Sequence, residues 1–302
     1  MADILVIGSL NADLVVRAPR FPAPGETIQG EDLATIPGGK GANQAVAAAR
    51  LGAQVAMIGR VGSDAFGSML IENLRQNRVD ASRVLPDENA ATGTAIIVVN
   101  ADGQNSIVLS PGANGKITPA DIKPASIPPA TLLLLQFEIP LETVVYAARL
   151  AKEKGLRVLL NPAPARPVPE ELLGLCDLLL PNETELALLT GEPVGDLASA
   201  EAAARRLVRR GARNVIVTLG ENGALLVNEE RTKHIPSFKV AVVDTTAAGD
   251  AFVGGLAVGL LDGRTLEDAV QYGCACGALA VTKFGAQPSL PTSEDVAKLL
   301  KR

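Results

Sequence analysis

Short runs of consecutive apolar residues alternate with helical patterns along most of this 302-residue chain. Runs that are apolar at every position are typical of parallel strands covered by helices on both faces. Several helical patterns end with a basic residue and then a glycine, as at Lys154-Gly155 and Arg210-Gly211. The alternation predicts a doubly wound, mostly parallel α/β sheet flanked by helices. We expect strands at 4–7, 55–58, 132–135, 158–160, 178–180, 215–218 and 239–243, and helices at 42–51, 66–76, 141–154, 183–189, 200–210, 249–261, 266–282 and 293–300.

Two regions interrupt this alternation. Residues 13–37 contain several prolines and two strand-like runs, 14–16 and 27–36. Residues 92–110 contain the runs 94–100 and 105–109 on either side of an Ala-Asp-Gly turn signal. The first of these runs is apolar on both faces, so it covers a ligand cleft, a partner subunit or both, unless the hairpin packs at the edge of the main core. We expect one domain, 1–302, with these regions as a small β appendage.

The composition excludes several classes of function. The chain has 28 basic and 33 acidic residues, whereas nucleic acids and anionic membranes require a basic surface. The single histidine, His234, excludes a zinc site with several His ligands and, without a G-x-S-x-G motif, a Ser-His-Asp hydrolase; we expect it at the surface. Cys176, Cys274 and Cys276 lack a disulfide spacing and predict reduced thiols. With no signal peptide and no membrane-spanning run, we expect a cytoplasmic protein.

The segment Asp244-Thr-Thr-Ala-Ala-Gly-Asp250 holds small residues at the expected start of a helix. Such a loop exposes backbone N–H groups and the positive end of the helix, which together bind anions. Asp250 then has two interpretations. It either caps the first helical turn, or takes a proton from an alcohol while the N–H groups hold a phosphoryl group. This segment alone leaves both open.

Two further motifs lie near the first strand and the first helix. Gly38-Gly-Lys-Gly-Ala-Asn43 is not a Walker A loop, because Gly41 rather than Ser or Thr follows the lysine. It suits the close approach of a hydroxyl-rich or phosphorylated ligand, or else forms a tight strand–helix turn. Asn11-Ala-Asp13 follows the first strand, where ligands bind in open α/β sheets. Its side chains either bind vicinal hydroxyls or form an Asx turn.

Three motifs occur in later loops. Pro181-Asn-Glu-Thr-Glu185 offers acids for a hydrated magnesium ion, or else Asn182 caps a helix. We expect Thr218-Leu-Gly-Glu-Asn-Gly223 to be a turn between two strands and Gly285-Ala-Gln-Pro-Ser289 to be a loop before the last helix. No G-x-G-x-x-G follows a strand, which disfavours a dinucleotide-dependent oxidoreductase.

In order along the chain, these motifs resemble the PfkB family of carbohydrate kinases over essentially the whole length. The resemblance implies that family's fold, with a small β-sheet lid drawn from about 13–37 and 92–110 that covers a sugar and clasps a homodimer. It implies ATP-dependent phosphorylation of a primary sugar hydroxyl, and its details are similar to members that act on D-ribose. The motifs are Gly8-Ser-Leu-Asn-Ala-Asp13, Phe21-Pro-Ala-Pro-Gly-Glu-Thr27, Gly38-Gly-Lys-Gly-Ala-Asn-Gln-Ala-Val-Ala47, Asn161-Pro-Ala-Pro-Ala165, Pro181-Asn-Glu-Thr-Glu185, Asp244-Thr-Thr-Ala-Ala-Gly-Asp250 and Gly285-Ala-Gln-Pro-Ser289.

The resemblance also implies a role for each matching residue. Asp250 would be the general base, and the N–H groups of Ala247, Ala248 and Gly249 would form an anion hole. Sugar hydroxyls would be held by Asn11, Asp13, Gly39, Lys40, Asn43, Glu138 and Asp250. Mg²⁺ and the phosphates of ATP would be organised by Asn182 and Glu185, and the nucleotide would be lined by Thr218, Gly220, Gly223, Gly249 and Cys274. A K⁺ ion beside the anion hole would be held by Asp244, Thr246, Ala280, Lys283, Gly285 and Ser289.

Two alternatives stay open. The first is another kinase of the same family that acts on deoxyribose, a nucleoside, fructose or a keto-acid sugar. The second is a non-catalytic sugar-binding protein, because a fold does not determine a function. The acid, the anion hole and the magnesium motif favour a kinase. We expect a small sugar substrate and a homodimer, with no nucleic-acid or membrane partner.

Overall fold

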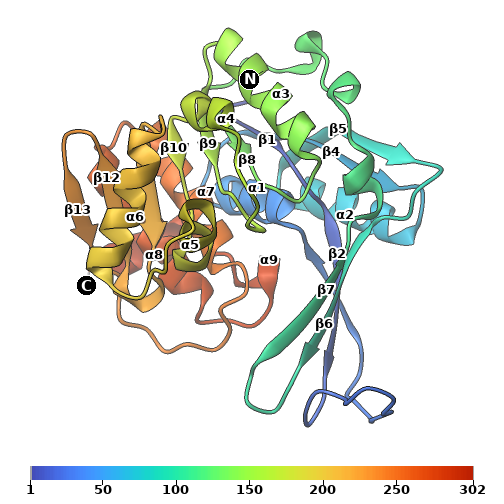
Figure 1. Ribbon diagram of the computed structural model, residues 1–302. Coiled ribbons are helices and arrows are strands. Elements are labelled where there is room, and N and C mark those ends of the chain that lie inside the picture. Colours follow the sequence, from blue (N-terminus) through green and yellow to red (C-terminus); the bar gives the residue numbers. More distant parts are fainter. Residues whose placement is uncertain (1, 302) are drawn as a thin grey trace.

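The computed structural model describes residues 2–301, which form two sheets (Figure 1). The large sheet has nine strands in the order β13-β12-β11-β10-β9-β8-β1-β4-β5, and pairing from β11 to β5 is parallel throughout. Strands β12 and β13 add antiparallel pairs at one edge. Its strands are β1 (Ile4–Ile7), β4 (Val55–Gly62), β5 (Val79–Asp87), β8 (Leu132–Leu135), β9 (Arg157–Leu160), β10 (Leu178–Leu179), β11 (Asn214–Thr218), β12 (Ala224–Asn228) and β13 (Thr232–Ile235).

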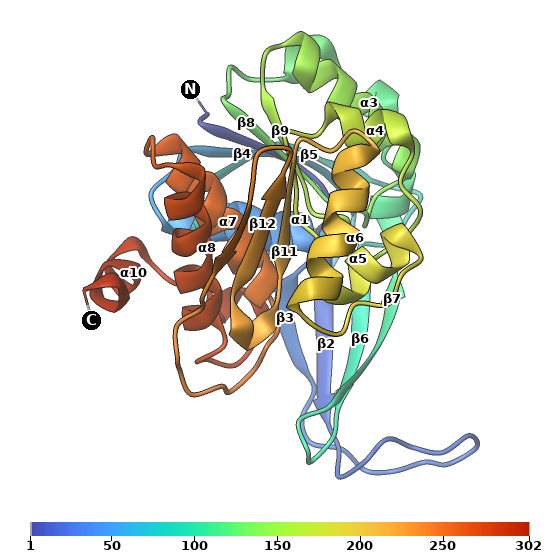
Figure 2. The same ribbon diagram turned by 60° about the vertical axis from the view of Figure 1, so that its left-hand side comes forward.

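Helices cover both faces of the large sheet, as Figure 2 shows for α7 and α8 on one side and α5 and α6 on the other. Successive residues of β1 point into two separate cores: Ile4 and Val6 into one, Leu5 and Ile7 into the other. This confirms the predicted doubly wound sheet. The helices are α1 (Lys40–Arg50), α2 (Ala65–Gln76), α3 (Leu141–Glu153), α4 (Glu170–Leu175), α5 (Glu183–Thr190), α6 (Leu197–Arg209), α7 (Ala248–Leu261), α8 (Leu266–Ala280), α9 (Ala286–Ser289) and α10 (Ser293–Leu300).

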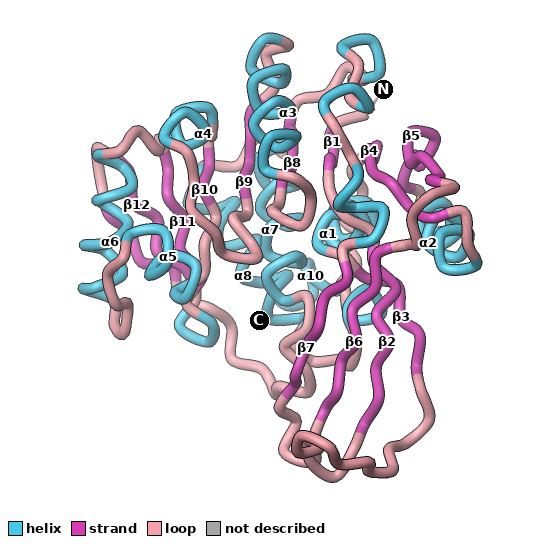
Figure 3. Tube along the Cα trace, turned by 45° about the vertical axis from the view of Figure 1, so that its right-hand side comes forward, coloured by secondary structure: helices cyan, strands magenta, loops and turns pink. Residues whose placement is uncertain are grey.

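The small sheet projects from the main body, and Figure 3 shows its strands side by side. Its order is β3-β2-β6-β7, with β2 and β6 parallel and the outer pairs antiparallel. All six residues of β7 are exposed, so this edge of the hairpin does not pack against the main core. The strands are β2 (Asn11–Arg17), β3 (Ala34–Gly38), β6 (Gly93–Val99) and β7 (Asn105–Ser110).

Two of the strands expected from the sequence are wrong. Residues 239–243 form no strand, because the large sheet ends at β13 and the chain crosses from there to α7 with Val242 and Val243 exposed. The expected strand at 27–36 shrinks to β3, since residues 27–33 are irregular and, apart from half-buried Ile28, exposed. Helix α6 begins earlier than expected, at Leu197, because Asp196 caps it.

Several local predictions are confirmed. Gly155 and Gly211 follow α3 and α6 with φ of +78° and +110°, a conformation that favours glycine. The three cysteines are free and buried, and His234 is exposed in β13. Among residues 2–301, none of the helices has the length and apolar character needed to cross a membrane.

Candidate active site

The candidate site is a cleft of about 190 Å³ at the carboxyl ends of β9, β10 and β11. In open α/β sheets, the carboxyl ends of the parallel strands and the N-termini of the following helices lie along the same edge. Polar loop residues from distant parts of the chain therefore converge there. The first turns of α1, α5 and α7 form the other walls. The cleft is lined by Lys40, Asn161, Leu180, Asn182, Glu185, Thr218, Thr245, Ala247, Ala248, Gly249, Asp250 and Val253.

Asp250 lies in the first turn of α7, and its carboxylate is held by two side chains of α1. Asn43 Nδ2 donates to Oδ2 at 2.9 Å, and Gln44 Nε2 donates to Oδ1 at 3.0 Å. Only 5% of Asp250 is exposed. Both oxygens therefore accept hydrogen bonds from amides, an arrangement that fixes the plane of the carboxylate.

The N-terminus of α7 is free of side-chain caps. Ala247 precedes the helix with φ of +60°, in the left-handed region, and no side chain of residues 2–301 caps the first turn, in which the Ala248 N–H donates to the Thr245 carbonyl oxygen at 3.3 Å. A Cβ on Gly249 would meet nothing within 4 Å, so open space faces this turn. Uncapped N–H groups at the positive end of a helix make an anion site beside Asp250.

Three of the expected sugar-binding residues, Asn11, Lys40 and Glu138, come together in one hydrogen-bonded group. Glu138 Oε2 accepts from Ser9 Oγ at 2.5 Å and from the Lys40 backbone N–H at 3.0 Å. Asn11 Nδ2 lies 3.4 Å from the same oxygen, and Asn114 Nδ2 donates to Asn11 Oδ1 at 2.8 Å. These bonds join β2, α1 and the segment after β8 into one polar wall that can receive hydroxyl groups.

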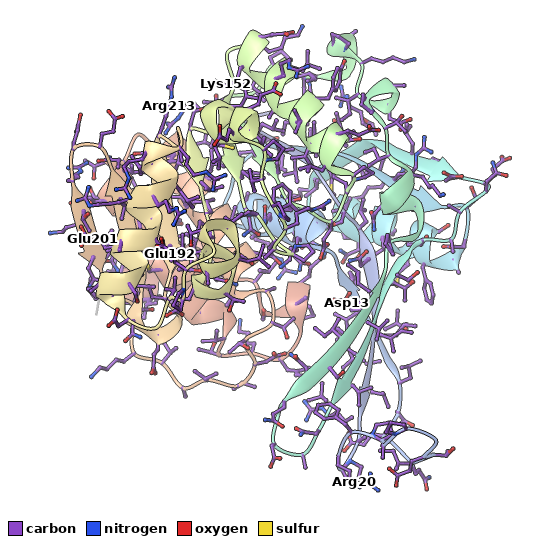
Figure 4. All side chains as sticks on the ribbon, in the orientation of Figure 1. Asp13, Arg20, Lys152, Glu192, Glu201 and Arg213 are labelled. Carbon is purple, nitrogen blue, oxygen red and sulfur yellow. The ribbon has the colours of Figure 1, made fainter. Side chains whose placement is uncertain are left out.

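Asp13 lies where the small sheet meets the main body (Figure 4). Burial raises the pKa of its carboxyl to about 7, and the neighbouring carboxylates Glu138 and Asp250 add to the rise while Lys40 opposes it. For the Lys40 ammonium, burial alone would lower the pKa, but the surrounding carboxylates, with Asp250 first, raise it. Lys40 therefore stays charged among four acids, where it balances their repulsion.

Asn182 and Glu185 form a reciprocal capping box at the start of α5. Glu185 N–H donates to Asn182 Oδ1 at 2.8 Å, and the Asn182 N–H donates to Glu185 Oε2 at 2.9 Å. The capping interpretation of this motif is therefore correct, and both residues also line the cleft. Burial raises the pKa of Glu185 above its ordinary value.

The donor set fits a magnesium ion that keeps most of its water. Within residues 2–301, no group of three or more His, Cys, Asp and Glu side chains is placed to cage a metal ion. Mg²⁺ is commonly bound through one or two carboxylates plus substrate phosphates and several waters. Glu185 supplies one carboxylate at the edge of the cleft, which suits an ion delivered with a nucleotide.

The nucleotide-side predictions divide into two groups. Thr218 lines the cleft at the end of β11, and its neighbouring turn carries Gly220 and Gly223 at φ of +55° and +92°. A Cβ on Gly223 would lie 2.1 Å from the Ile235 carbonyl oxygen, so this glycine is required by the turn itself. Cys274 is buried on α8 in the core and does not line the cleft; burial raises the pKa of its thiol to about 12.

Asp244 connects two of the other residues that were expected to hold a cation, Thr246 and Gly285. Its Oδ1 accepts from the Thr246 N–H at 2.9 Å, and its Oδ2 accepts from the Gly285 N–H at 2.8 Å. The bond to Gly285 ties the segment before α7 to the segment before α9. Within the second segment, the Lys283 N–H donates to the Ala280 carbonyl at 3.3 Å. The Ser289 hydroxyl donates instead to Ala286. The backbone carbonyls of this loop are the hard oxygen donors that a K⁺ ion requires.

Sequence reasoning missed several polar residues of the site. Gln44 and Asn161 lay inside quoted motifs without an assigned role, and a polar residue within an otherwise apolar helix face was the available signal for Gln44. Gln136 directly follows the apolar strand β8, at the edge where ligands bind, and this position was its signal. Ser9 and Thr245 also lie inside motifs named from the sequence but had no assigned role, whereas Asn114 carried no signal, because it comes from a distant segment.

Comparison with known proteins agrees with this geometry. Residues 1–293 match the family model of the pfkB family carbohydrate kinases. The chain therefore belongs to the PfkB family of carbohydrate kinases, as its motifs indicated.

Individual relatives cover nearly the whole chain. It is 42% identical over 300 residues to a ribokinase of Haemophilus influenzae, covering 99% of this chain and 98% of the relative. It is also 42% identical over 301 residues to a deoxyribokinase of Salmonella typhi, with the same coverage. A crystal structure of a Thermotoga maritima ribokinase superimposes with a TM-score of 0.93 at 40% identity, covering 100% of both chains. A structure of an Arabidopsis thaliana ribokinase complexed with ribose and ATP gives 0.92 at 37% identity, covering 100% of this chain and 99% of the other.

Proposed function

We propose that this protein transfers the γ-phosphoryl group of ATP to the primary hydroxyl of D-ribose, giving D-ribose 5-phosphate and ADP. One observation carries the proposal. A carboxylate fixed by two amides, Asp250, stands beside the uncapped N-terminus of α7 in the same cleft. A proton acceptor beside an anion site is what transfer of a phosphoryl group to an alcohol requires. The likeness to an Arabidopsis thaliana ribokinase complexed with ribose and ATP supports the choice of substrates.

In this reaction the sugar oxygen forms a bond to the γ-phosphorus, and the bond from that phosphorus to the bridging oxygen of ADP breaks. The proton of the sugar hydroxyl passes to the carboxylate of Asp250. The N–H groups of Ala247, Ala248 and Gly249 receive the charge on the transferred group. Because the groups are already oriented, the main contributions are positioning and electrostatic stabilisation.

The sugar would bind against the polar wall formed by Asn11, Asp13, Glu138 and Lys40, with Gly39 allowing the backbone to approach closely. A Cβ on Gly39 would lie 2.7 Å from the Asn11 N–H nitrogen, so a side chain here would displace that wall. Asn43 has a further feature: its Oδ1 is buried and has no hydrogen-bond partner within residues 2–301. A buried acceptor without a partner suits a sugar hydroxyl as its donor.

Two ions complete the proposal. Asn182 and Glu185 would hold hydrated Mg²⁺ with the phosphates, and the ion when bound neutralises their charge. The loop of Asp244, Thr246, Ala280, Lys283, Gly285 and Ser289 would hold K⁺ beside the anion site. Thr218, Gly220, Gly223 and Gly249 would border the nucleotide, whereas the core position of Cys274 on α8 removes it from this set.

The small sheet would act as a lid over the sugar and as the contact between two copies of the chain. Water excluded from the cleft cannot compete with the sugar as phosphoryl acceptor. The apolar side chains exposed on β6 and β7 support this part of the proposal. We further propose a single functional domain and a cytoplasmic location, where ATP is available.

A second candidate substrate is 2-deoxyribose, which the equal identity to a deoxyribokinase favours. The two sugars are distinguished by ADP release from MgATP with ribose, deoxyribose, fructose and adenosine, each with K⁺ or with a bulky organic cation. Ribose-dependent turnover stimulated by K⁺ is expected. Faster turnover on deoxyribose would transfer the proposal to that sugar, and sugar binding by calorimetry without turnover would replace the kinase with a binding protein.

A further inference from the structure

Gln44 is buried beside Asp250, and the sugar-binding and nucleotide-binding roles leave it without a function. It is 0% exposed, and both its amide nitrogen and its amide oxygen have protein partners, so it offers no free group to a sugar or a nucleotide. Its Nε2 donates to Asp250 Oδ1 at 3.0 Å and lies 3.3 Å from Asn161 Oδ1. Its Oε1 accepts from Gln136 Nε2 at 2.6 Å. Gln44 therefore connects the proposed base to the ends of β8 and β9.

This chain of amides has only one consistent direction. An ionised carboxylate has acceptors alone, so Gln44 must present its NH₂ group to Asp250. Its carbonyl oxygen then faces Gln136, which in turn must present its own NH₂ group. The last atom in this series of hydrogen bonds is Gln136 Oε1, which is buried and has no hydrogen-bond partner within residues 2–301. A Cβ on Gly8 would lie 2.1 Å from this oxygen. The direction is thus imposed by the charge on Asp250.

The close packing of α1 on α7 sets the distance between these groups. A Cβ on Gly254 would lie 2.6 Å from Ala47 Cβ, so only small residues permit this approach. Gly254 and Ala47 each lie one helical turn beyond Asp250 and Asn43. The two helices therefore meet one turn away from the site, which brings consecutive residues of α1 onto the two oxygens of one carboxylate.

We propose that Gln44 is a positioning residue for the reaction: together with Gln136 it orients the Asp250 carboxylate for proton transfer. Asn43 holds the other oxygen but is also proposed to meet the sugar, whereas Gln44 acts only through Asp250. The inference rests on the proposed function, because it needs Asp250 to be the base. The inference assigns the buried amides of Gln44 and Gln136 an effect on kcat and not on the affinity for the sugar.

Other charges also face Asp250. They are Lys40 on α1, Asp13 on β2 and Glu185 on α5, with Glu138 acting on the first two. Gln44 makes no hydrogen bond to any of them. A change at Gln44 therefore alters the donor on Asp250 and leaves these charges in place.

The test uses Gln44→Glu and Gln44→Leu in the full-length protein, with Gln76→Leu as control. Gln76 is an exposed residue of α2 that bonds only Glu72. Gln44→Glu keeps the shape but places a second carboxylate against Asp250, and Gln44→Leu removes the donor. We measure kcat and its pH profile with ribose and MgATP, the ribose Kd by calorimetry, and thermal unfolding.

We expect kcat to fall by ~10-fold to ~10²-fold in Gln44→Leu, with the ribose Kd changed less than about threefold. The acid side of the kcat profile should move to higher pH by about one unit, and further in Gln44→Glu, because the ionised base has lost a donor or gained a like charge. If Gln44→Leu does not fold, Gln44→Glu and Gln136→Leu decide the question. Folded variants with the kcat and pH profile of the wild type would overturn the positioning role alone. Wild-type protein that binds ribose without turnover would instead overturn the proposed function.

Discussion

Gly38 and Asp13 lie so close together that a Cβ on Gly38 would stand 2.1 Å from Asp13 Oδ2. They belong to the paired strands β3 and β2, at the point where the small sheet enters the main body. The absence of a side chain at Gly38 therefore leaves space for the carboxylate of Asp13, which belongs to the proposed sugar site.

Gly38→Ala is expected to displace the Asp13 carboxylate and to weaken sugar binding. No positive φ is found at Gly38, so the effect comes from lost space rather than from backbone strain. Calorimetry should give a ribose Kd about fivefold to about 30-fold higher, since a polar contact contributes about 1–2 kcal/mol. Gly174→Ala on α4 is the control, because its Cβ would meet nothing within 4 Å. An unchanged Kd in Gly38→Ala would exclude Asp13 from the sugar site.

Asp13 should make stability depend on pH. Burial and the neighbouring acids raise its pKa to about 7 in the folded protein, from an ordinary value of 3.8. Between these values the native state holds a proton that the unfolded chain releases, so stability falls as pH rises through this window. Asp13→Asn removes that titration. Its melting temperature relative to the wild type should therefore be higher at about pH 8 than at about pH 5.

Asp102→Asn, in the exposed turn between β6 and β7, is the control for this experiment. It should leave the difference between the two pH values as it is in the wild type. A melting-temperature difference for Asp13→Asn that is the same at both pH values would contradict a raised pKa at Asp13.

Asp250→Asn is expected to fold normally and to lose turnover. The amide keeps the shape of the carboxylate but cannot accept the sugar proton, and a general base contributes ~10²–10⁴-fold. ADP release with ribose and MgATP measures the loss, and Asp262→Asn at the C-terminal end of the same helix serves as the matched control. Near-normal turnover in folded Asp250→Asn would exclude the base role.

The exposed edge of the small sheet should mediate the proposed dimer. Val108 on β7 is 65% exposed, and its cross-strand partner Ile96 is 50% exposed. Light scattering at about micromolar concentration should give a dimer for the wild type, and Val108→Asp should shift the mass toward a monomer because it places a charge in an apolar contact. Leu197→Asp, at an exposed position of α6, should leave the mass unchanged. A wild-type monomer would refute the contact.

Periodicity identified the large sheet well, because parallel strands buried on both faces must be apolar at every position. Periodicity predicted strands wrongly in two segments whose residues are largely exposed and outside the sheets. The run 239–243 is as apolar as a strand but joins neither sheet, and Val242 and Val243 stay exposed. Residues 27–33 remain irregular, and all but Ile28 are exposed.

Local motifs predicted, without any structure, segments that line the candidate cleft: the acid of α7, the small residues before it and the glycine-rich start of α1. Only the tertiary structure decided how these residues act on one another. The hydrogen bond from Asn43 to Asp250 spans 207 positions in the sequence, and the amide chain through Gln44 and Gln136 joins three elements. Such contacts depend on how α1 packs against α7 and the sheet. The sequence pattern of one segment does not specify how far that segment lies from another in the folded protein. The raised pKa of Asp13 has the same origin, because burial and neighbouring charges exist only once the chain has folded.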